Sequence, residues 1–302
     1  MNAQNILNHM KYIKDEETMN TISDEISKGL MSRGIFPTIL NLDTTNFSTE
    51  IEKGEKLPKP GNAKNKRFDK RIIGLGLVAN EDGIPFIHDT YPGNIHDSKI
   101  LPEIVDRITK RLMTLKIDPK SITVVMDKGN NSIDNIKNIT DEKKMHLVGS
   151  LKRDQAKDLL RIPLEEFDIL YTNKKKHEIR GYRSKLEVFG QTFTIVVSHN
   201  PATEKRQSIS YERSKQEFLA GMEKLKKKYE KEGGRGRKMQ QAGLIREATK
   251  LIHKNLQGVF KYEIRTKPKG VDYWVDQNKE KEMVQAFGKN VIFTDIHDLS
   301  LI

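Results

Sequence analysis

The amino-acid sequence predicts an α/β protein in which a mixed sheet is flanked by helices. Strand-length and helix-length segments follow one another in the order strand, hairpin, helix, strand, helix, strand, which is typical of mixed sheets with crossover helices. Hydrophobic residues make up 35% of the 302 positions and charged residues 32%, but the apolar residues cluster into regular runs. The chain is therefore expected to fold, with large charged faces, as one large domain or two ordinary ones.

The elements expected up to residue 151 follow from apolar periodicity and turn signals. Residues 1–35 carry apolar side chains at helical spacing, and Gly34 ends that helical segment. Asn80-Glu81-Asp82-Gly83 has the composition of a hairpin turn, and residues 47–66 are expected to form a polar loop. The predicted strands are 38–42, 71–79, 84–90, 122–126 and 146–151, and the predicted helices are 98–115 and 132–138.

The character of the chain changes after residue 152, where long basic segments begin. We expect an N-terminal helical segment (1–35), the first part of the core (36–151), an insertion subdomain of strands and basic helices (152–285) and a resumed core strand (286–302). The insertion is predicted to hold strands at 167–172, 178–189, 192–198, 260–264 and 273–276, and helices at 152–160, 210–231 and 239–256. Gly233–Gly236 should break the long helix, and Ser300 resembles a helix N-cap.

The composition limits the partners and the compartment. Lys and Arg exceed Asp and Glu by 54 to 42, so the formal charge is +12, which favours binding to polyanions. A solvated basic surface is the alternative interpretation. The chain has no cysteine, which excludes disulfides and thiolate metal sites. Neither a signal peptide nor a membrane-spanning run is expected, so we predict a cytoplasmic protein.

Two aspartates follow apolar strands in the same way. Asp43 follows the strand 38–42 and is expected at or near its end, in the folded core, and Asp127 follows the strand 122–126. A buried carboxylate costs several kcal/mol unless hydrogen bonds or a cation compensate it. On neighbouring strands, the two carboxylates could converge on a divalent cation site. The alternatives are an Asx-turn at Asp43 and an ordinary turn aspartate before Gly129.

Several motifs, taken in order, resemble insertion-sequence transposases of the DDE class. Asp43-Thr44-Thr45 resembles the first aspartate motif, and Val124–Gly129 with Ser132 resembles the second. The remaining similarities are Tyr91-Pro92-Gly93-Asn94 with Asp97-Ser98-Lys99, Ser150-Leu151-Lys152-Arg153, and Phe293-Thr294-Asp295. The resemblance runs from about residue 38 to the end, and its order is more specific than any single motif.

The resemblance implies a ribonuclease-H-like core of five strands, interrupted by an insertion. Asp43 and Asp127 would then be catalytic ligands of Mg²⁺ (or Mn²⁺) in a two-metal phosphoryl transfer that cleaves and joins DNA strands. The implied partners are double-stranded DNA, as transposon ends and target, and further copies of the chain in a homo-oligomer.

The family's third acid is a glutamate in a Tyr/Arg/Glu/Lys pattern on a helix after the resumed strand. This sequence stops at Ile302, where that helix should begin. We therefore expect a truncated or split transposase, whose missing helix a second polypeptide or copy would supply.

Other candidate sites are weaker. Gly74–Ala79 matches a dinucleotide-binding pattern but lies inside a predicted strand, so we reject that site. His88 and His96 are more typical of ordinary polar residues than of metal ligands. The cations of Lys224–Lys228, with Arg235, Arg237 and Lys238, could bind phosphates or form a solvated helix face. Trp274 could stack on a base, but a core position is the favoured interpretation.

Two further functions compete with a transposase. One is a non-catalytic DNA-binding or dimerising fragment that modulates an intact transposase. The other is a phosphate-monoester hydrolase with Asp43 as nucleophile. For the hydrolase, Thr45 stands where a second acid would be expected, and the net charge favours a polymeric anion over a small ester.

Overall fold

A computed structural model describes residues 3–10, 12–13, 15–52, 56–231 and 239–298 of the chain. Contacts divide the chain into two compact units, and each is described by itself. The first comprises residues 1–152, 183–196 and 292–300, and the second comprises 153–182, 197–291 and 301–302. None of the helices in the described residues is long and apolar enough to span a lipid bilayer.

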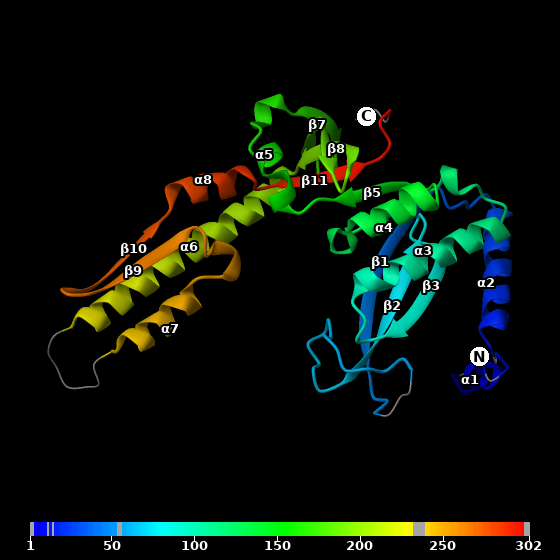
Figure 1. Cartoon of the computed structure of the whole chain (residues 1–302), viewed down its shortest axis with the longest axis horizontal. Coiled ribbons are helices and arrows are strands. Elements are labelled where there is room, and N and C mark those ends of the chain that lie inside the picture. Colours follow the sequence, from blue (N-terminus) through cyan, green and yellow to red (C-terminus); the bar gives the residue numbers. More distant parts are fainter. Residues whose placement is uncertain (1–2, 11, 14, 53–55, 232–238, 299–302) are drawn as a thin grey trace. The chain divides into compact units, whose positions relative to one another are not determined.

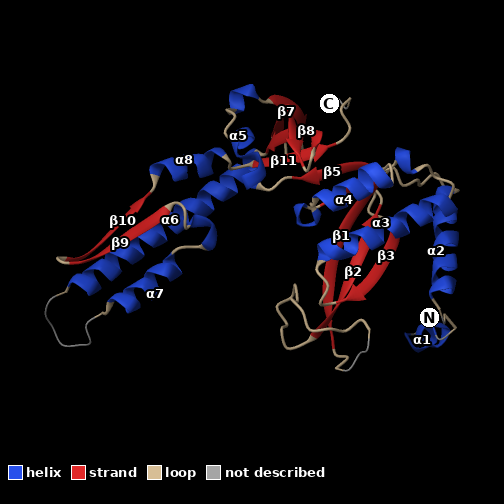
Figure 2. Cartoon of the chain, in the orientation of Figure 1, coloured by secondary structure: helices blue, strands red, loops and turns tan. Residues whose placement is uncertain are grey.

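In the first half of the chain, two helices precede three consecutive strands, after which helices and strands alternate (Figures 1 and 2). The helices are α1 (Ala3–Met10), α2 (Glu16–Met31), α3 (Asp97–Thr114) and α4 (Ile133–Lys137). The strands are β1 (Ile39–Thr49), β2 (Arg71–Ala79), β3 (Pro85–Pro92), β4 (Thr123–Met126) and β5 (His146–Ser150). Short 3-10 or π turns lie at Pro119–Ser121, Lys128–Asn130 and Asn138–Glu142. The helical N-terminus and every predicted strand of this half are confirmed, with different bounds for most of them.

The second half contains the remaining strands and the longest described helix, α6 (Pro201–Glu230). Its other helices are α5 (Lys157–Leu160), α7 (Gln241–Leu251) and α8 (Gln277–Gln285). Its strands are β6 (Asp168–Thr172), β7 (Glu178–Val188), β8 (Gln191–His199), β9 (Phe260–Thr266), β10 (Lys269–Val275) and β11 (Lys289–Thr294). The 3-10 turns are Arg153–Ala156, Leu164–Glu166 and Lys254–Leu256. Gly233–Gly236 and Ser300 lie outside the described residues.

The main sheet has the strand order β3-β2-β1-β4-β5-β11-β8-β7-β6. Its first five strands form an antiparallel meander, β3-β2-β1, followed by β4 and β5 parallel to β1. This is the ribonuclease-H-like order, so the predicted fold class is confirmed. The sheet is nonetheless larger than the five strands expected, because β11 pairs with β5 and is followed in the same sheet by β8, β7 and β6.

One face of this sheet is covered by α3, whose apolar stripe is buried. Ile104, Val105 and Ile108 are fully buried, and each such side chain contributes roughly 1.5–3 kcal/mol. Gly76 of β2 lets the helix approach, since a Cβ there would lie 2.5 Å from Cδ1 of Ile104. The residues of β1 that face α3 are buried, whereas the alternating residues are exposed.

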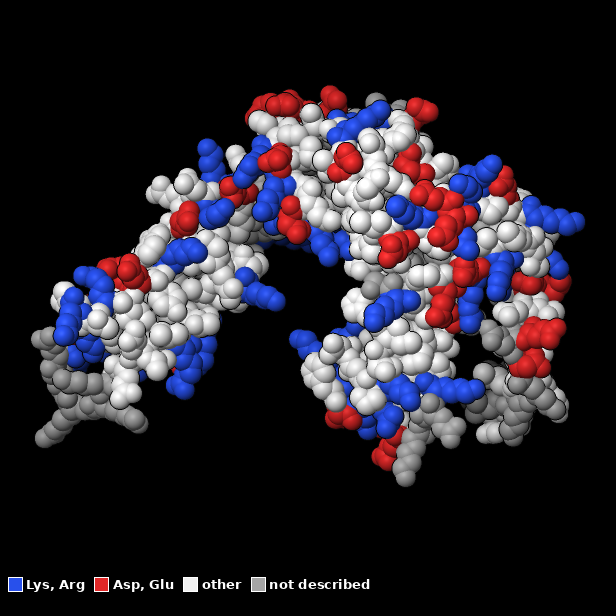
Figure 3. Space-filling view, in the orientation of Figure 1, with Lys and Arg blue, Asp and Glu red and all other residues white. Residues whose placement is uncertain are grey.

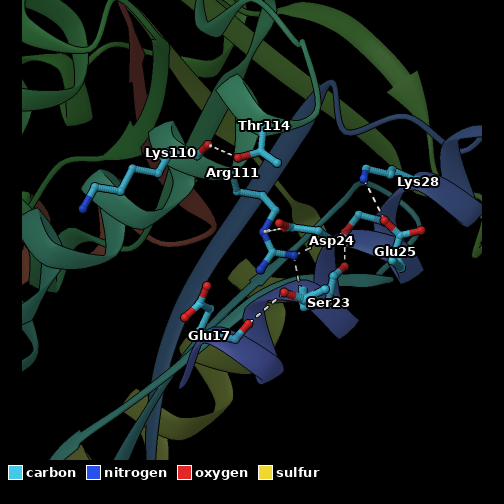
Figure 4. Close-up of polar contacts among 10 residues, drawn as sticks. Glu17, Ser23, Asp24, Glu25, Lys28, Lys110, Arg111 and Thr114 are labelled. Atoms are coloured by element: carbon cyan, nitrogen blue, oxygen red, sulfur yellow. Dashed lines mark hydrogen bonds and ion pairs between the residues drawn. The ribbon is translucent and has the colours of Figure 1, made fainter. Parts of the chain in front are cut away.

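Helix α2 is held by a largely buried cation of α3 (Figure 4). The side chain of Arg111 is only 11% exposed and forms an ion pair with Asp24, with Nε–Oδ1 at 3.0 Å. Arg111 also donates hydrogen bonds to Oγ of Ser23 at 2.7 Å and of Ser27 at 3.4 Å. These contacts give α2 a defined position in the first unit.

The second unit has a core of its own, built on α6. That helix begins at Pro201, nine residues before the predicted start, and the side chain of Asn200 caps it by accepting from the N–H groups of Ala202 and Thr203. Phe218 is fully buried and stacks on Phe260 with ring centroids 4.7 Å apart. The core cluster contains Tyr211, Phe218, Met222, Tyr229, Leu244, Ala248, Leu256, Val259, Phe260, Val271 and Phe287.

Candidate functional site

Asp43 lies in the middle of β1, and this corrects the prediction of a buried strand-end aspartate. The strand continues because each residue from Asn41 to Thr49 pairs with β2, so the expected loop at 47–66 begins only after Thr49. Leu42 and Thr44 are buried, whereas Asp43 is exposed on the opposite face. Because side chains alternate along a strand, the carboxylate is presented to solvent from a paired, rigid backbone.

Asp127 comes directly after β4 and is also exposed. It occupies the N-cap position of the turn Lys128–Asn130, with φ −77° and ψ 155°, but its side chain makes no capping hydrogen bond. Asp127 is therefore a turn aspartate, as the alternative interpretation expected, but its carboxylate is not used to hold the turn.

The parallel pairing of β1 with β4 brings the two aspartates to the same level of the sheet. Their last paired residues are Leu42 and Met126, so Asp43 and Asp127 occupy the next position on adjacent strands. Neighbouring strands lie about 4.8 Å apart, and residues at equal register point to the same face. The prediction that the two aspartates lie on neighbouring strands is confirmed.

The two carboxylates are suitable donors for a hard divalent cation. Oδ1 of Asp43 accepts a hydrogen bond from the backbone N–H of Thr44 at 2.8 Å. Neither carboxylate forms an ion pair with a residue in the described ranges. Mg²⁺ keeps several waters and needs only one or two carboxylates, so this donor set fits it. Among the described residues, no group of three His, Asp or Glu side chains is placed to hold a metal ion.

Asparagines fix the segment that follows Asp127, and the sequence prediction assigned them no role. Nδ2 of Asn131 donates to the carbonyl of Ser150 at 2.9 Å, and Nδ2 of Asn135 donates to the carbonyl of Asn130 at 2.9 Å. The amide oxygens of Asn130 and Asn131 are buried without a hydrogen-bond partner. In the sequence, these asparagines could have been noticed as two consecutive residues, Asn130 and Asn131, directly before Ser132, which caps α4.

Asp295, in one of the later sequence landmarks, does not join the two aspartates. Its carboxylate accepts from Nδ1 of His146 at 2.8 Å and from the backbone N–H of Leu147 at 2.7 Å. His146 and Leu147 lie at the start of β5. The other end of β5 lies beside Asp127, because Gly149 pairs with Met126, the residue before Asp127. Asp295 therefore lies at the end of β5 that is opposite to Asp127.

The other candidates from the sequence lie elsewhere. Gly74 and Gly76 lie inside strand β2, as predicted, so they do not form the strand-to-helix turn that a dinucleotide site needs. His88 and His96 are exposed and belong to no group of metal ligands in the described chain. Trp274 is 46% exposed on β10, so the favoured core position is wrong. Lys224–Lys228 lie on α6, and Lys227 pairs with Glu223 at 3.3 Å. Arg235, Arg237 and Lys238 fall outside the described residues.

Comparison with known proteins gives one family match. The family model described as "Transposase DDE domain" matches residues 35–254. No curated protein matches the chain. A solved structure described as "Mos1 transposase paired-end complex with left transposon end" shares 13% sequence identity, with a TM-score of 0.27. That alignment covers 44% of this chain and 42% of the Mos1 chain, and a likeness this small supports no inference about fold or function.

Proposed function

This chain belongs to the family of transposase DDE domains, and on that premise we propose that it is a DNA transposase whose reaction centre contains Asp43 and Asp127. The observation that carries the proposal is the parallel pairing of β1 with β4, which puts the two aspartates side by side on an exposed face. The proposed substrates are transposon-end and target DNA, and the net charge of +12 suits such a polyanion.

In this proposal, Asp43 and Asp127 hold Mg²⁺ or Mn²⁺ through their carboxylates. When bound, such ions lower the pKa of bound water and stabilise charge on a phosphate during strand cleavage and strand joining. Asp43 is positioned by the strand hydrogen bonds of β1, and Asp127 by the segment that Asn131 ties to Ser150. The backbone that carries each carboxylate is therefore fixed before any ligand arrives.

The test is metal-dependent nicking of a DNA duplex that carries the element's own ends. We expect wild-type protein to cleave with Mg²⁺ or Mn²⁺, and Asp43→Asn or Asp127→Asn to lower the rate by about a hundredfold or more, because several kcal/mol of metal-assisted stabilisation is lost. Asp134→Asn is the matched control, since Asp134 is exposed on α4 close to Asp127 in the chain. Cleavage by both site variants at the wild-type rate would refute the assignment.

A non-catalytic DNA-binding role is the second candidate, because the described residues contain no third metal ligand beside the two aspartates. A protein of that kind would bind the same duplex without cleaving it, and Asp43→Asn would leave the affinity unchanged. Hydrolysis of an aryl phosphate by the wild-type protein would instead favour the monoesterase alternative.

A further inference from the structure

The connection between β1 and β2 ends in a strongly basic segment. Residues 62–71, called here the basic loop, read Asn-Ala-Lys-Asn-Lys-Arg-Phe-Asp-Lys-Arg and contain five cations and one acid. The proposed function uses none of them. Figure 3 shows Lys and Arg side chains gathered at the lower end of the unit that contains β1–β3, among a few acidic ones.

The basic loop is built onto the strand that carries Asp43. Nδ2 of Asn46 donates to the carbonyl of Asn62 at 3.1 Å, and Oδ1 of Asn46 accepts from the N–H of Lys64 at 2.9 Å. Oγ of Ser48 donates to Oδ1 of Asn65 at 3.0 Å. Because both partners on β1 are side chains of a paired strand, the loop has a defined position beside that strand.

Lys64 places a cation one residue from Asp43. Its ammonium donates a hydrogen bond to the carbonyl of Thr44. Strand β4 ends at Met126, opposite Leu42, so β1 has no partner on the β4 side at Thr44. The ammonium group of Lys64 therefore lies at the residue of β1 that follows Asp43.

The basic loop contains two lysines without an ion pair to a described residue and one exposed aromatic ring. Lys64 and Lys66 are exposed and form no ion pair with a residue in the described ranges. Arg67 pairs with Asp69, and Lys70 pairs with Glu50. Phe68 is 71% exposed between these cations. Ammonium groups suit phosphates, and an aromatic ring without a protein partner suits the face of an unstacked base.

We propose that the basic loop holds the DNA strand that leads into the Asp43–Asp127 site, with Lys64 and Lys66 on phosphates and Phe68 against an unpaired base. The inference rests on the proposed function and specifies how that site receives its substrate. From Asp43 to Thr49, at the base of the loop, β1 rises about 20 Å. At the duplex rise of roughly 3.4 Å per nucleotide, about six nucleotides span this length of β1.

The test is binding of the full chain to two fluorescein-labelled duplexes, measured by fluorescence anisotropy in EDTA so that no cleavage occurs. One probe is fully paired, and the other carries a single-stranded overhang of about six nucleotides. We expect Phe68→Ala to lower the affinity for the overhang probe by about tenfold and to have a much smaller effect on the paired probe. Phe36→Ala is the matched control, because Phe36 is 50% exposed and precedes the first residue of β1, whereas the loop follows its last residue.

The cations are tested on the fully paired probe. We expect Lys64→Gln with Lys66→Gln to reduce the slope of log affinity against log salt by about 1.8, the value for two lost phosphate contacts. Lys174→Gln with Lys175→Gln, at the exposed turn between β6 and β7, is the control pair. All replaced side chains in the basic loop are exposed, so circular dichroism should show the wild-type fold.

The outcomes separate this inference from the proposed function. If the variants of the basic loop bind both probes as their controls do, the loop does not hold DNA, whether or not the wild type cleaves. If they lose affinity as expected while the wild type never cleaves with Mg²⁺ or Mn²⁺, the loop assignment stands and the catalytic proposal fails. A change in oligomeric state of Phe68→Ala, with unchanged DNA affinity, would assign the ring to contact between copies.

Discussion

At the scale of single residues, the hydrogen bonds of Glu280 explain its lowered pKa. Its Oε1 accepts hydrogen bonds from Nζ of Lys215 and from the hydroxyl of Tyr211, both at 2.7 Å. The bond from Lys215, followed by that from Tyr211, lowers the pKa of Glu280 below its ordinary value of 4.5. Burial, and then the Glu280 carboxylate, raise the pKa of Tyr211. The ionised form of Glu280 therefore stabilises the folded state.

The sign of the pH dependence follows from this direction. A carboxyl whose folded pKa is lowered contributes stability above the unfolded pKa and loses it as the pH falls through the folded pKa. We expect Glu280→Gln to cost about 1–2 kcal/mol of unfolding free energy at pH 7 and much less at pH 3. Urea unfolding of wild type and variant at both pH values measures this, with exposed Glu212→Gln as control. An equal loss at pH 3 and pH 7 would contradict the assignment.

At the scale of elements, α2 depends on its contact with Arg111. If Arg111 is replaced by alanine, Asp24, Ser23 and Ser27 lose their shared donor, and Ser27 is only 2% exposed. Breaking a largely buried ion pair costs about 3–5 kcal/mol, since the remaining charge has no partner. We expect the amides of α2 to lose hydrogen-exchange protection while those of β1 keep theirs. Lys110→Ala, on the exposed side of α3, should change neither set.

The elements also show how far the sequence predicts the structure. β2 has its predicted bounds because its apolar run is framed by Lys70 and by the Asn80 turn. β1 is longer than predicted, since pairing with β2 overrides the polar residues after Asp43. The start of α6 was missed although Asn200-Pro201 is an N-cap followed by proline, and α8 was missed because few apolar residues mark it.

The sequence predicted the two aspartates and their neighbouring strands, but not the exposure of Asp43 or the contacts that support the site. The two Asp motifs identify Asp43 and Asp127 from local sequence, and their catalytic role stays a prediction. Their exposure depends on which face α3 covers, and the stabilising bond from Asn131 to Ser150 joins residues 19 positions apart. Such contacts depend on long-range packing, which periodicity along the chain does not report.

At the scale of the whole molecule, the net charge of +12 favours the proposed binding to DNA, which should then depend on salt. If about six phosphates are neutralised, the affinity for a mixed-sequence duplex should fall by about a thousandfold between 50 and 200 mM salt. Titrations of the wild-type chain at several salt concentrations measure the slope. A slope near zero would mean that the basic residues form a solvated surface without a role in binding.

The alternation of β1 has a genetic consequence. Leu40 and Leu42 must face α3, and Asp43 is exposed only because it is one position out of phase with them. A single codon deleted between Ile39 and Asp43 would keep the aspartate but turn its carboxylate toward the apolar layer. In this segment, a variant shortened by one residue would lose the candidate site while retaining both of its acidic residues.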